Sequence, residues 1–424
     1  MKPLAVILLL LVPAIAAAQT PPSGFVSVFG DYLPNRDNTV ELRGRIFAEE
    51  VLDPTPKLLI TASAFVEGLV AKRATSRTDA IFRVQEASVD YKGGRVDVFA
   101  GFATMAWGRL DELQPTDVVN PLDVSRFFFE GRSEARLPVG LGRVRYHASE
   151  NASFEGVFVP FFRKGRFDQL DEPTSPFNLA TLAETQAALA PPPGLALPPF
   201  RVTEREPSSS LRNAQGGARF NATSGRVDWS LSVYDGIEPF GLYQASAPAP
   251  TAAFVPVEIV YPRFTMVGAD FETVRGQWGL RGELATFVRD SFQETGAITV
   301  TEGHSIDAGV GVDRKAGSYR LSATVLVHHE SYDRLQAAGT DGRTDVSMIV
   351  STDRTFARER YQLRGFGVYN PSEGSAFLRT IATAKLGDNL ALEGSGGWFI
   401  GDGRDLVGRF SDNDFVYLRL KYYF

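Results

Sequence analysis

The chain has 424 residues with a formal net charge of −6; it is 44% hydrophobic and 11% aromatic, and it contains 40 Gly and no Cys. The absence of Cys excludes disulfide scaffolds, thiol catalysis, iron–sulfur clusters and cysteine zinc sites. The acidic balance argues against a nucleic-acid-binding protein, and the apolar content is too high for a disordered chain.

The N-terminal segment has the pattern of a secretory signal peptide. Lys2 is followed by an apolar run from Leu4 to Ile15, and small residues end the segment at Ala18. A membrane-anchoring helix, the alternative, needs about 20 apolar residues. We therefore expect residues 1–18 to be a cleaved signal peptide and residues 19–424 to be the mature protein.

After this segment the dominant hydrophobic period is two. In the last stretch of the chain, apolar residues alternate with Arg419 and Lys421; they are Val416, Leu418, Leu420, Tyr422 and Phe424. Alternation of this kind predicts β-strands with one apolar and one polar face. The segments that carry it, in chain order, are 24–32, 38–50, 57–70, 79–91, 95–106, 140–149, 151–163, 214–223, 226–236, 260–274, 277–290, 303–314, 317–330, 345–357, 359–370, 375–386, 388–400 and 413–424.

The connections between these segments alternate between short and long. Tight links with turn residues fall at 92–94, 149–151, 224–225, 275–276, 315–317 and 387–388, and long links at 107–139, 164–213, 237–259, 291–302, 331–344 and 401–412. We therefore predict an all-β fold, a single transmembrane antiparallel up-and-down β-barrel of about 18 strands with long external loops. Sixteen strands is the alternative count, because 24–32 is weak and 79–91 breaks phase. A soluble sandwich or propeller is disfavoured, since we find no repeat or domain boundary.

The chain ends in Tyr422-Tyr423-Phe424, which resembles the C-terminal signal of Gram-negative outer-membrane barrels. The resemblance implies location in the outer membrane of a Gram-negative bacterium, contact with its lipid, and recognition of the strand ending in Phe424 by the barrel-assembly machinery.

If the apolar face meets lipid, the polar face lines the lumen. Inward acids would include Glu283 and Glu393, and the expected inward bases are Arg43, Arg45, Arg143, Arg145, Arg219, Arg281, Arg289, Arg379, Lys385, Arg419 and Lys421. Guanidinium groups bind carboxylates and phosphates well, so such a conduit would favour anionic solutes. The surplus of 36 Arg over 8 Lys equally fits a GC-rich genome.

The long connection 107–139 combines charge with many large apolar residues, which is unusual for a solvated loop. Residues 107–123 read W-G-x-x-D-x-L-x-P-T-D-V-V-N-P-x-D, similar to a segment of several poorly characterised outer-membrane protein families. The connection also resembles the porin loop that folds inward and narrows the pore. The resemblance implies a loop in the lumen and a constriction lined by Arg109, Asp111, Asp117, Asp123, Arg126 and Arg132. Alternatively, Asp117, Asn120 and Asp123 cap turns around two prolines.

The connection 164–213 holds Ser175-Pro176, which could begin a short helix that plugs the lumen or covers its mouth. No G-x-S-x-G elbow, Walker loop or H-E-x-x-H motif is present. His304 and Ser305 would face opposite sides of a strand, as would His328 and His329. We therefore expect no catalytic residue, metal or cofactor.

These observations favour a porin-like outer-membrane channel for passive passage of small polar solutes, with anionic solutes favoured in its Arg-lined version. The alternatives are a conduit for lipid or amphipathic molecules and a barrel that serves as scaffold for a hydrolase or binding protein. The expected partners are outer-membrane lipid and small solutes, with no nucleic acid; a homo-oligomer stays open.

Overall fold

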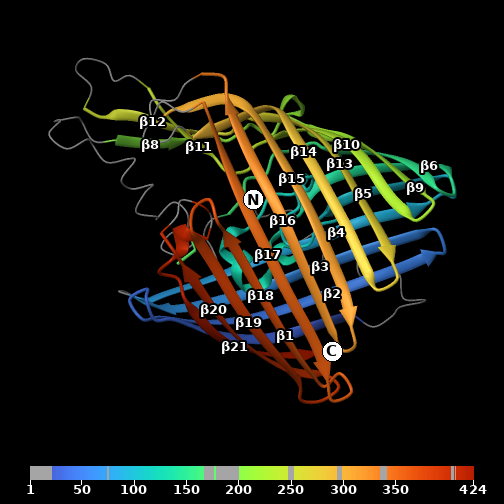
Figure 1. Ribbon diagram of the computed structural model, residues 1–424, viewed down its shortest axis with the longest axis vertical. Helices are drawn as coiled ribbons and strands as arrows, with labels where there is room; N and C mark the ends of the chain where they lie inside the picture. Colours follow the sequence, from blue (N-terminus) through green and yellow to red (C-terminus); the bar gives the residue numbers. More distant parts are fainter. Residues whose placement is uncertain are drawn as a thin grey trace.

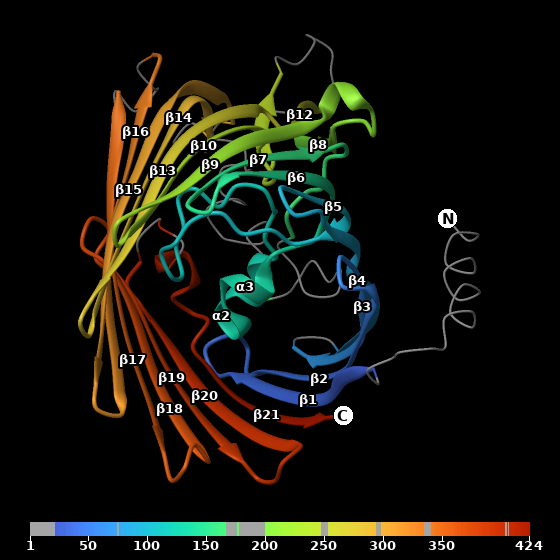
Figure 2. The same ribbon diagram turned by 90° about the vertical axis from the view of Figure 1, so that its right-hand side faces the viewer.

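The computed structural model describes residues 22–73, 76–166, 176–177, 200–246, 253–293, 298–334, 341–402, 405 and 407–424. Eighteen strands form one antiparallel sheet. The sheet closes on itself because its first strand pairs with both the second and the last (Figure 1, Figure 2). The predicted up-and-down barrel of 18 strands is confirmed.

All eighteen segments with the two-residue period form barrel strands. They are β1 (Ser23–Leu33), β2 (Thr39–Thr55), β3 (Leu58–Lys72), β4 (Ser76–Lys92), β5 (Val96–Ala103), β6 (Val139–Ser149), β7 (Ala152–Val159), β9 (Gln215–Ser224), β10 (Val227–Ile237), β13 (Arg263–Arg275), β14 (Trp278–Gln293), β15 (Val300–Ala316), β16 (Tyr319–Tyr332), β17 (Gly342–Phe356), β18 (Tyr361–Asn370), β19 (Ser375–Lys385), β20 (Leu390–Ile400) and β21 (Phe415–Tyr423).

The two rims of the barrel differ in the length of their connections. Three of the turns at one rim, the short-turn rim, contain glycines with positive φ: Gly225 (65°), Gly276 (63°) and Gly317 (64°). The two ends of the barrel chain also meet there, where Gly24 N–H donates to the Phe424 carbonyl at 3.1 Å. The opposite rim, the long-loop rim, carries the connections 104–138, 160–214 and 238–262.

The outer face of the barrel is apolar, as the alternation predicts. Val416, Leu418 and Leu420 of β21 are between 43% and 63% exposed, whereas Arg419 between them faces the lumen. None of the described helices is long and apolar enough to cross a membrane.

The lumen contains an apolar core, so the expectation that the inner face is simply polar is wrong. Two short helices, α2 (Val124–Glu130) and α3 (Arg132–Ala135), lie inside the ring of strands (Figure 2). The inner wall has large apolar side chains where it contacts these helices. Contact with the helices removes these side chains from water, which favours apolar residues there. The larger cluster contains Phe29, Leu33, Val124, Phe128, Phe129, Phe177, Phe377, Phe399, Val407, Phe410, Phe415 and Tyr417.

Two long connections form a small second sheet that the sequence did not predict. It consists of β8 (Phe200–Glu204), β11 (Leu242–Ala245) and β12 (Val255–Val260), beyond the long-loop rim (Figure 1). β12 pairs in parallel with β8 and antiparallel with β11. The described chain also has two short 3₁₀ helices, η3 (Leu211–Asn213) and η4 (Gly408–Phe410). The helix expected after Ser175 lies outside the described residues, apart from a turn at 176–177.

Candidate functional site

The connection 104–138, here called the lumen segment, is fastened to the barrel wall by Glu283 of β14. One carboxylate oxygen accepts hydrogen bonds from the backbone N–H groups of Arg109 and Leu110, the latter at 2.6 Å. The other accepts from the Thr116 backbone at 3.2 Å and the Thr116 hydroxyl at 2.9 Å. Gly108 has φ of 93°, and a Cβ on it would stand 2.8 Å from both carboxylate oxygens. The sequence therefore uses glycine where the segment approaches this carboxylate most closely.

Asp117 and Asn120 join the beginning and the end of the lumen segment to each other. Asp117 is 6% exposed, pairs with Arg132 at 3.1 Å and Arg136 at 2.7 Å, and accepts from the Trp107 backbone N–H at 3.2 Å. The Asn120 side-chain oxygen accepts from the Met105 N–H at 2.7 Å, and its amide nitrogen donates to the carbonyl of Leu137 at 2.8 Å. The partners of both residues lie 10 to 19 positions away along the chain, so these contacts join distant parts of the lumen segment and are not caps of local turns.

The next charged groups fasten α2 to the wall. Asp123, 1% exposed, pairs with Arg83 of β4 at 3.3 Å and Arg166 at 3.7 Å, and burial raises the pKa of its carboxyl. Arg126 is also buried, between Glu67 of β3 at 3.1 Å and Glu130 at 2.9 Å. Buried charges of this kind require partners, which these pairs supply.

Between the lumen segment and the wall of β14 to β21 lies a cavity of about 1020 Å³, here called the main cavity. Arg320, near the start of β16, borders it close to the short-turn rim. Glu330 at the other end of the same strand and Asn370 at the end of β18 border it close to the long-loop rim. The main cavity therefore runs along most of the height of the wall.

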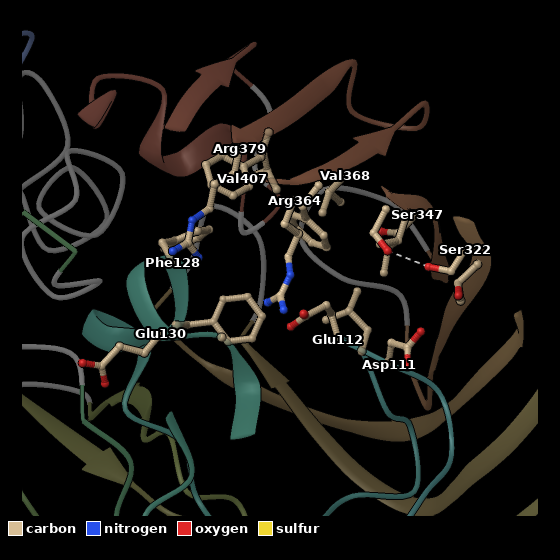
Figure 3. Close-up of a pocket in the computed structure, with 18 of the residues that line it drawn as sticks. Asp111, Glu112, Phe128, Glu130, Ser322, Ser347, Arg364, Val368, Arg379 and Val407 are labelled. Carbon is tan, nitrogen blue, oxygen red and sulfur yellow. Dashed lines mark hydrogen bonds between the residues drawn. The ribbon is translucent and has the colours of Figure 1, made fainter. Parts of the chain in front are cut away.

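Opposite charges face one another across the main cavity (Figure 3). Arg364 projects from the wall toward Asp111 and Glu112 of the lumen segment. Asp111 contacts Arg281 of the wall at 2.6 Å, whereas Arg364 has its cross-strand neighbour Asp353 at 3.6 Å. The cavity is bordered by the bases Arg281, Arg320, Arg343, Arg364, Arg379, Arg409, Arg419 and Lys421 and by the acids Asp111, Glu112, Glu130, Glu134, Glu330, Asp345, Asp353, Glu393 and Asp405.

A second cavity of about 510 Å³, here called the smaller cavity, lies on the other side of the lumen segment. It is bordered by Trp107 and by wall residues of β4 to β9 and β13, and it extends toward the short-turn rim, where Asn221 and Glu272 lie near strand ends. Its lining residues are Glu86, Phe99, Ala103, Thr104, Met105, Ala106, Trp107, Gly108, Arg109, Leu141, Arg143, Arg145, Glu155, Arg219, Asn221 and Glu272.

The residues predicted to line a pore therefore fall into four groups. Asp111, Arg281, Arg379, Arg419 and Lys421 border the main cavity, and Arg109, Arg143, Arg145 and Arg219 border the smaller one. Arg43 and Arg45 face a narrow crevice beside Glu67 and Glu130. Asp117, Asp123, Arg126 and Arg132 are engaged in ion pairs that hold the lumen segment.

Arg289 is a correction, because the structure places it on the outer face. It pairs directly with Thr265, whose neighbour Met266 is fully buried in the lumen. An irregularity in the pairing of β14 between Phe287 and Asp290 shifts the phase of the strand. Arg289 instead contacts Asp235 at 3.0 Å.

Arg320, Arg343 and Arg364 border the main cavity but were not predicted from the sequence. The signal was present for Arg364, since it follows Leu363, which is 47% exposed on the outer face. Glu112, Glu130 and Glu134 carried no such signal, because only the folding of the lumen segment brings them to the cavity.

The histidines lie as the strand geometry predicts. Ser305 is buried on the inner face, where it donates to Asp290 at 2.6 Å, and exposed His304 contacts the Val288 carbonyl at 2.7 Å. His328 lies between Asp307 at 2.6 Å and Glu330 at 3.0 Å on the inner face. His329 contacts Thr344 on the other side. Within the described ranges no group of three or more His, Asp and Glu is placed to hold a metal ion.

Comparison with solved structures finds chains with the same fold over nearly their whole length. OccK5 (OpdH) of Pseudomonas aeruginosa is 11% identical with a TM-score of 0.50, over 95% of this chain and 96% of that one. OccAB4 of Acinetobacter baumannii is 11% identical with a TM-score of 0.50, over 96% and 98% of the two chains. OccAB3 of the same organism is 10% identical with a TM-score of 0.51, over 95% and 99%. At these identities the similarity shows a common fold.

A comparison with curated proteins finds no match. The family described as "Protein of unknown function (DUF1302)" matches residues 84–355. This range is more than half of the chain and includes the lumen segment and, in the wall of the main cavity, strands β14 to β16 and all but the last residue of β17. The chain therefore belongs to the DUF1302 family.

Proposed function

We propose that this protein is a porin-like outer-membrane channel for the passive passage of small polar solutes, and that the main cavity is its passage. The observation that carries the proposal is the extent of the main cavity, which is bordered near one rim by Arg320 and near the other by Glu330 and Asn370. Charged and polar side chains border most of this path, and such a lining keeps a pore hydrated.

The Arg-lined version of the proposal, in which anionic solutes are favoured, rests on two exposed guanidinium groups. Arg320 and Arg364 expose 62% and 54% of their side chains, whereas Glu130 exposes 3% and Glu330 19%. Among the acids, Asp111 exposes a similar fraction, 52%, but it pairs with Arg281 at 2.6 Å. A passing carboxylate therefore meets two donors that are more accessible than Glu130 and Glu330. Guanidinium groups bind carboxylates through paired hydrogen bonds.

The proposed placement follows from the rims. Residues 1–18 are proposed to be a cleaved signal peptide and residues 19–424 the mature barrel in the outer membrane of a Gram-negative bacterium. The short-turn rim would face the periplasm and the long-loop rim the exterior, as in bacterial barrels generally. The assembly machinery would read β21, which pairs with β1 where the barrel closes.

A second candidate, passage of amphipathic molecules, is favoured by the apolar side chains on one side of the main cavity. Phe366 and Val368 of β18 border it together with Phe127 of α2, and none of the three is fully buried. A solute with an apolar part could contact these groups while its polar part meets Arg364.

Conductance of the purified protein in planar lipid bilayers tests the channel. We expect stepwise ion currents, and a reversal potential in a KCl gradient that reports preference for chloride. The absence of current, also after deletion of residues 110–130, would overturn the channel, and preference for potassium would overturn only the Arg-lined version. Liposome swelling with hexanoate and acetate separates the second candidate, which predicts faster entry of hexanoate despite its larger size.

A further inference from the structure

The smaller cavity contains a guanidinium group for which no described residue provides a hydrogen-bond acceptor. Arg143 of β6 borders this cavity and exposes 19% of its side chain. Among the described residues its contacts are Asp90 at 3.8 Å, too long for a hydrogen bond, and the ring of Phe99 at 5.1 Å. The same oxygen of Asp90 has a closer partner in Lys92, at 3.0 Å, and the other oxygen of Asp90 is buried without a hydrogen-bond partner among the described residues.

The other three arginines of the smaller cavity are held by carboxylates. Arg109 contacts Asp270 at 2.7 Å, and Arg145 contacts Glu155 at 2.6 Å. Arg219 contacts the same Asp270 at 2.7 Å, but its Nη1 atom is buried without a hydrogen-bond partner among the described residues. A buried donor without an acceptor destabilises the folded protein. Arg143 and Arg219 thus both border the cavity with donors that no described protein atom satisfies.

The remaining lining of the smaller cavity is apolar on the side of the lumen segment. Met105 and Trp107 border it there, and Phe99 and Leu141 border it on the wall. The rest of the wall is polar, with Glu86, Glu155 and Glu272 among the arginines, so these apolar side chains form one patch of the lining. A cavity that combines an apolar patch with a few placed polar groups is typical of a small-molecule site. The combination fits a molecule with one negatively charged group and an apolar body.

We propose that the smaller cavity is a binding site for a small carboxylate with an apolar body, whose carboxylate is held by Arg143. The site is separate from the proposed passage, and it stands whether or not the main cavity conducts. Its ligand would contact Trp107 to Arg109, and the next residues, Asp111 to Leu113, border the main cavity.

Trp107 supplies a local reporter for this site. It is 2% exposed, and its indole N–H donates to Glu155 at 3.0 Å. The other three tryptophans, Trp229, Trp278 and Trp398, lie on the outer face of the barrel. Replacing those three by Phe gives a full-length protein whose tryptophan fluorescence comes from the cavity alone.

The experiment titrates this single-tryptophan protein in detergent with hexanoate, and with neutral hexanamide as the matched control, at constant ionic strength. We expect a saturable fluorescence change with hexanoate and none with hexanamide. The variant R143Q should weaken hexanoate binding at least tenfold, because the charge-assisted hydrogen bonds are lost. R143K keeps the charge but loses the paired N–H donors of the guanidinium group, so its affinity for hexanoate should lie between those of the parent and R143Q. R289Q, on the outer face of the barrel beside Asp235, should bind as the parent does.

Three results would overturn the proposal. The first is an equal response to hexanamide, and the second is the absence of a saturable response to hexanoate. The third is binding that R143Q leaves unchanged, which would mean that Arg143 only neutralises Asp90. Folding of each variant is checked by gel electrophoresis, since a folded barrel changes its mobility only after it is heated. If R143Q fails it, R143K alone decides, and an unchanged affinity in R143K then counts against the proposal.

Discussion

Glu283 accepts two hydrogen bonds from Thr116, from its backbone N–H at 3.2 Å and from its hydroxyl at 2.9 Å. The same carboxylate accepts from the backbone at Arg109 and Leu110, so one wall side chain organises both ends of a turn in the lumen segment. Hydrogen bonds to a charged group contribute about 1.5–3 kcal/mol each. The position of the lumen segment beside the main cavity therefore depends strongly on this carboxylate.

The variant E283Q should loosen the lumen segment without unfolding the barrel. A carboxamide has one acceptor oxygen, so its NH₂ group would face N–H donors, and at least two hydrogen bonds would be lost at a cost of about 3 kcal/mol. We expect larger single-channel conductance and more current noise in planar bilayers. E272Q is the control, because the contacts of Glu272 are longer, 3.4 Å to Arg109 and 3.6 Å to Arg281. Equal traces for both variants would contradict the role of Glu283.

The variant G108A should have a similar effect for a different reason. Its Cβ would lie 2.8 Å from the Glu283 carboxylate, at a φ of 93° that alanine adopts only with strain. Since both substitutions disturb one contact, their effects should not add. The double variant G108A/E283Q should therefore conduct like E283Q alone. Conductance that rises in proportion to both single effects would show that Gly108 acts elsewhere.

The variant D117N should destabilise the lumen segment more than R132Q does. Asp117 is buried against Arg132 and Arg136, so removal of its charge leaves two guanidinium groups without their counter-ion, at a cost of about 3–5 kcal/mol. R132Q leaves the contact at 2.7 Å between Asp117 and Arg136 in place. Chymotryptic cleavage of the folded protein within the lumen segment measures the difference, because neither substitution removes an aromatic cleavage site. Faster cleavage of R132Q than of D117N would contradict the role of Asp117 as the shared counter-ion of Arg132 and Arg136.

The variant R364E should move the ion selectivity of the channel toward cations. Arg364 exposes 54% of its side chain beside the main cavity, and its replacement changes the local charge by two units. The reversal potential in a KCl gradient measures the shift. R289E is the matched control, because Arg289 lies on the outer face beside Asp235. An identical shift for both variants would mean that the passage does not run past Arg364.

The loop carboxyl of Glu238 predicts a pH dependence of stability. Its pKa is raised to about 7, chiefly by burial; nearby Asp290 also raises the pKa, and a hydrogen bond from the Phe240 N–H at 3.2 Å lowers it. Between the unfolded value of 4.5 and about 7 the folded state binds more protons than the unfolded state, so stability falls as the pH rises through this window. The loss is roughly 3 kcal/mol for a shift of this size.

Urea unfolding of E238Q at pH 5 and pH 8 measures this dependence. The neutral amide does not titrate, so E238Q should lose less stability than the wild type between the two values. The control E258Q alters a more exposed acid of β12, whose side chain is 43% exposed, and should keep the wild-type dependence. A wild-type slope in E238Q would assign the dependence to other groups.

The sequence by itself determined the barrel. Alternation of the kind seen from Val416 to Phe424 predicts which side chains face lipid, and the turn residues indicate where each strand ends. Both signals are local, since a strand exposes its faces with a period of two wherever it lies. All eighteen strands could be predicted for this reason, and the error at Arg289 arose where an irregular pairing broke the period.

Tertiary structure decided what the lumen contains. The motif beginning at Trp107 showed that a long connection was unusual, but the contact of Thr116 with Glu283 joins residues that are 167 positions apart. Such contacts have no periodicity, so whether Asp117 lines a pore or holds a loop could not be read from its neighbours. The division of the lumen into two cavities, with Arg364 beside one and Arg143 beside the other, followed only from the packing of the lumen segment against the wall.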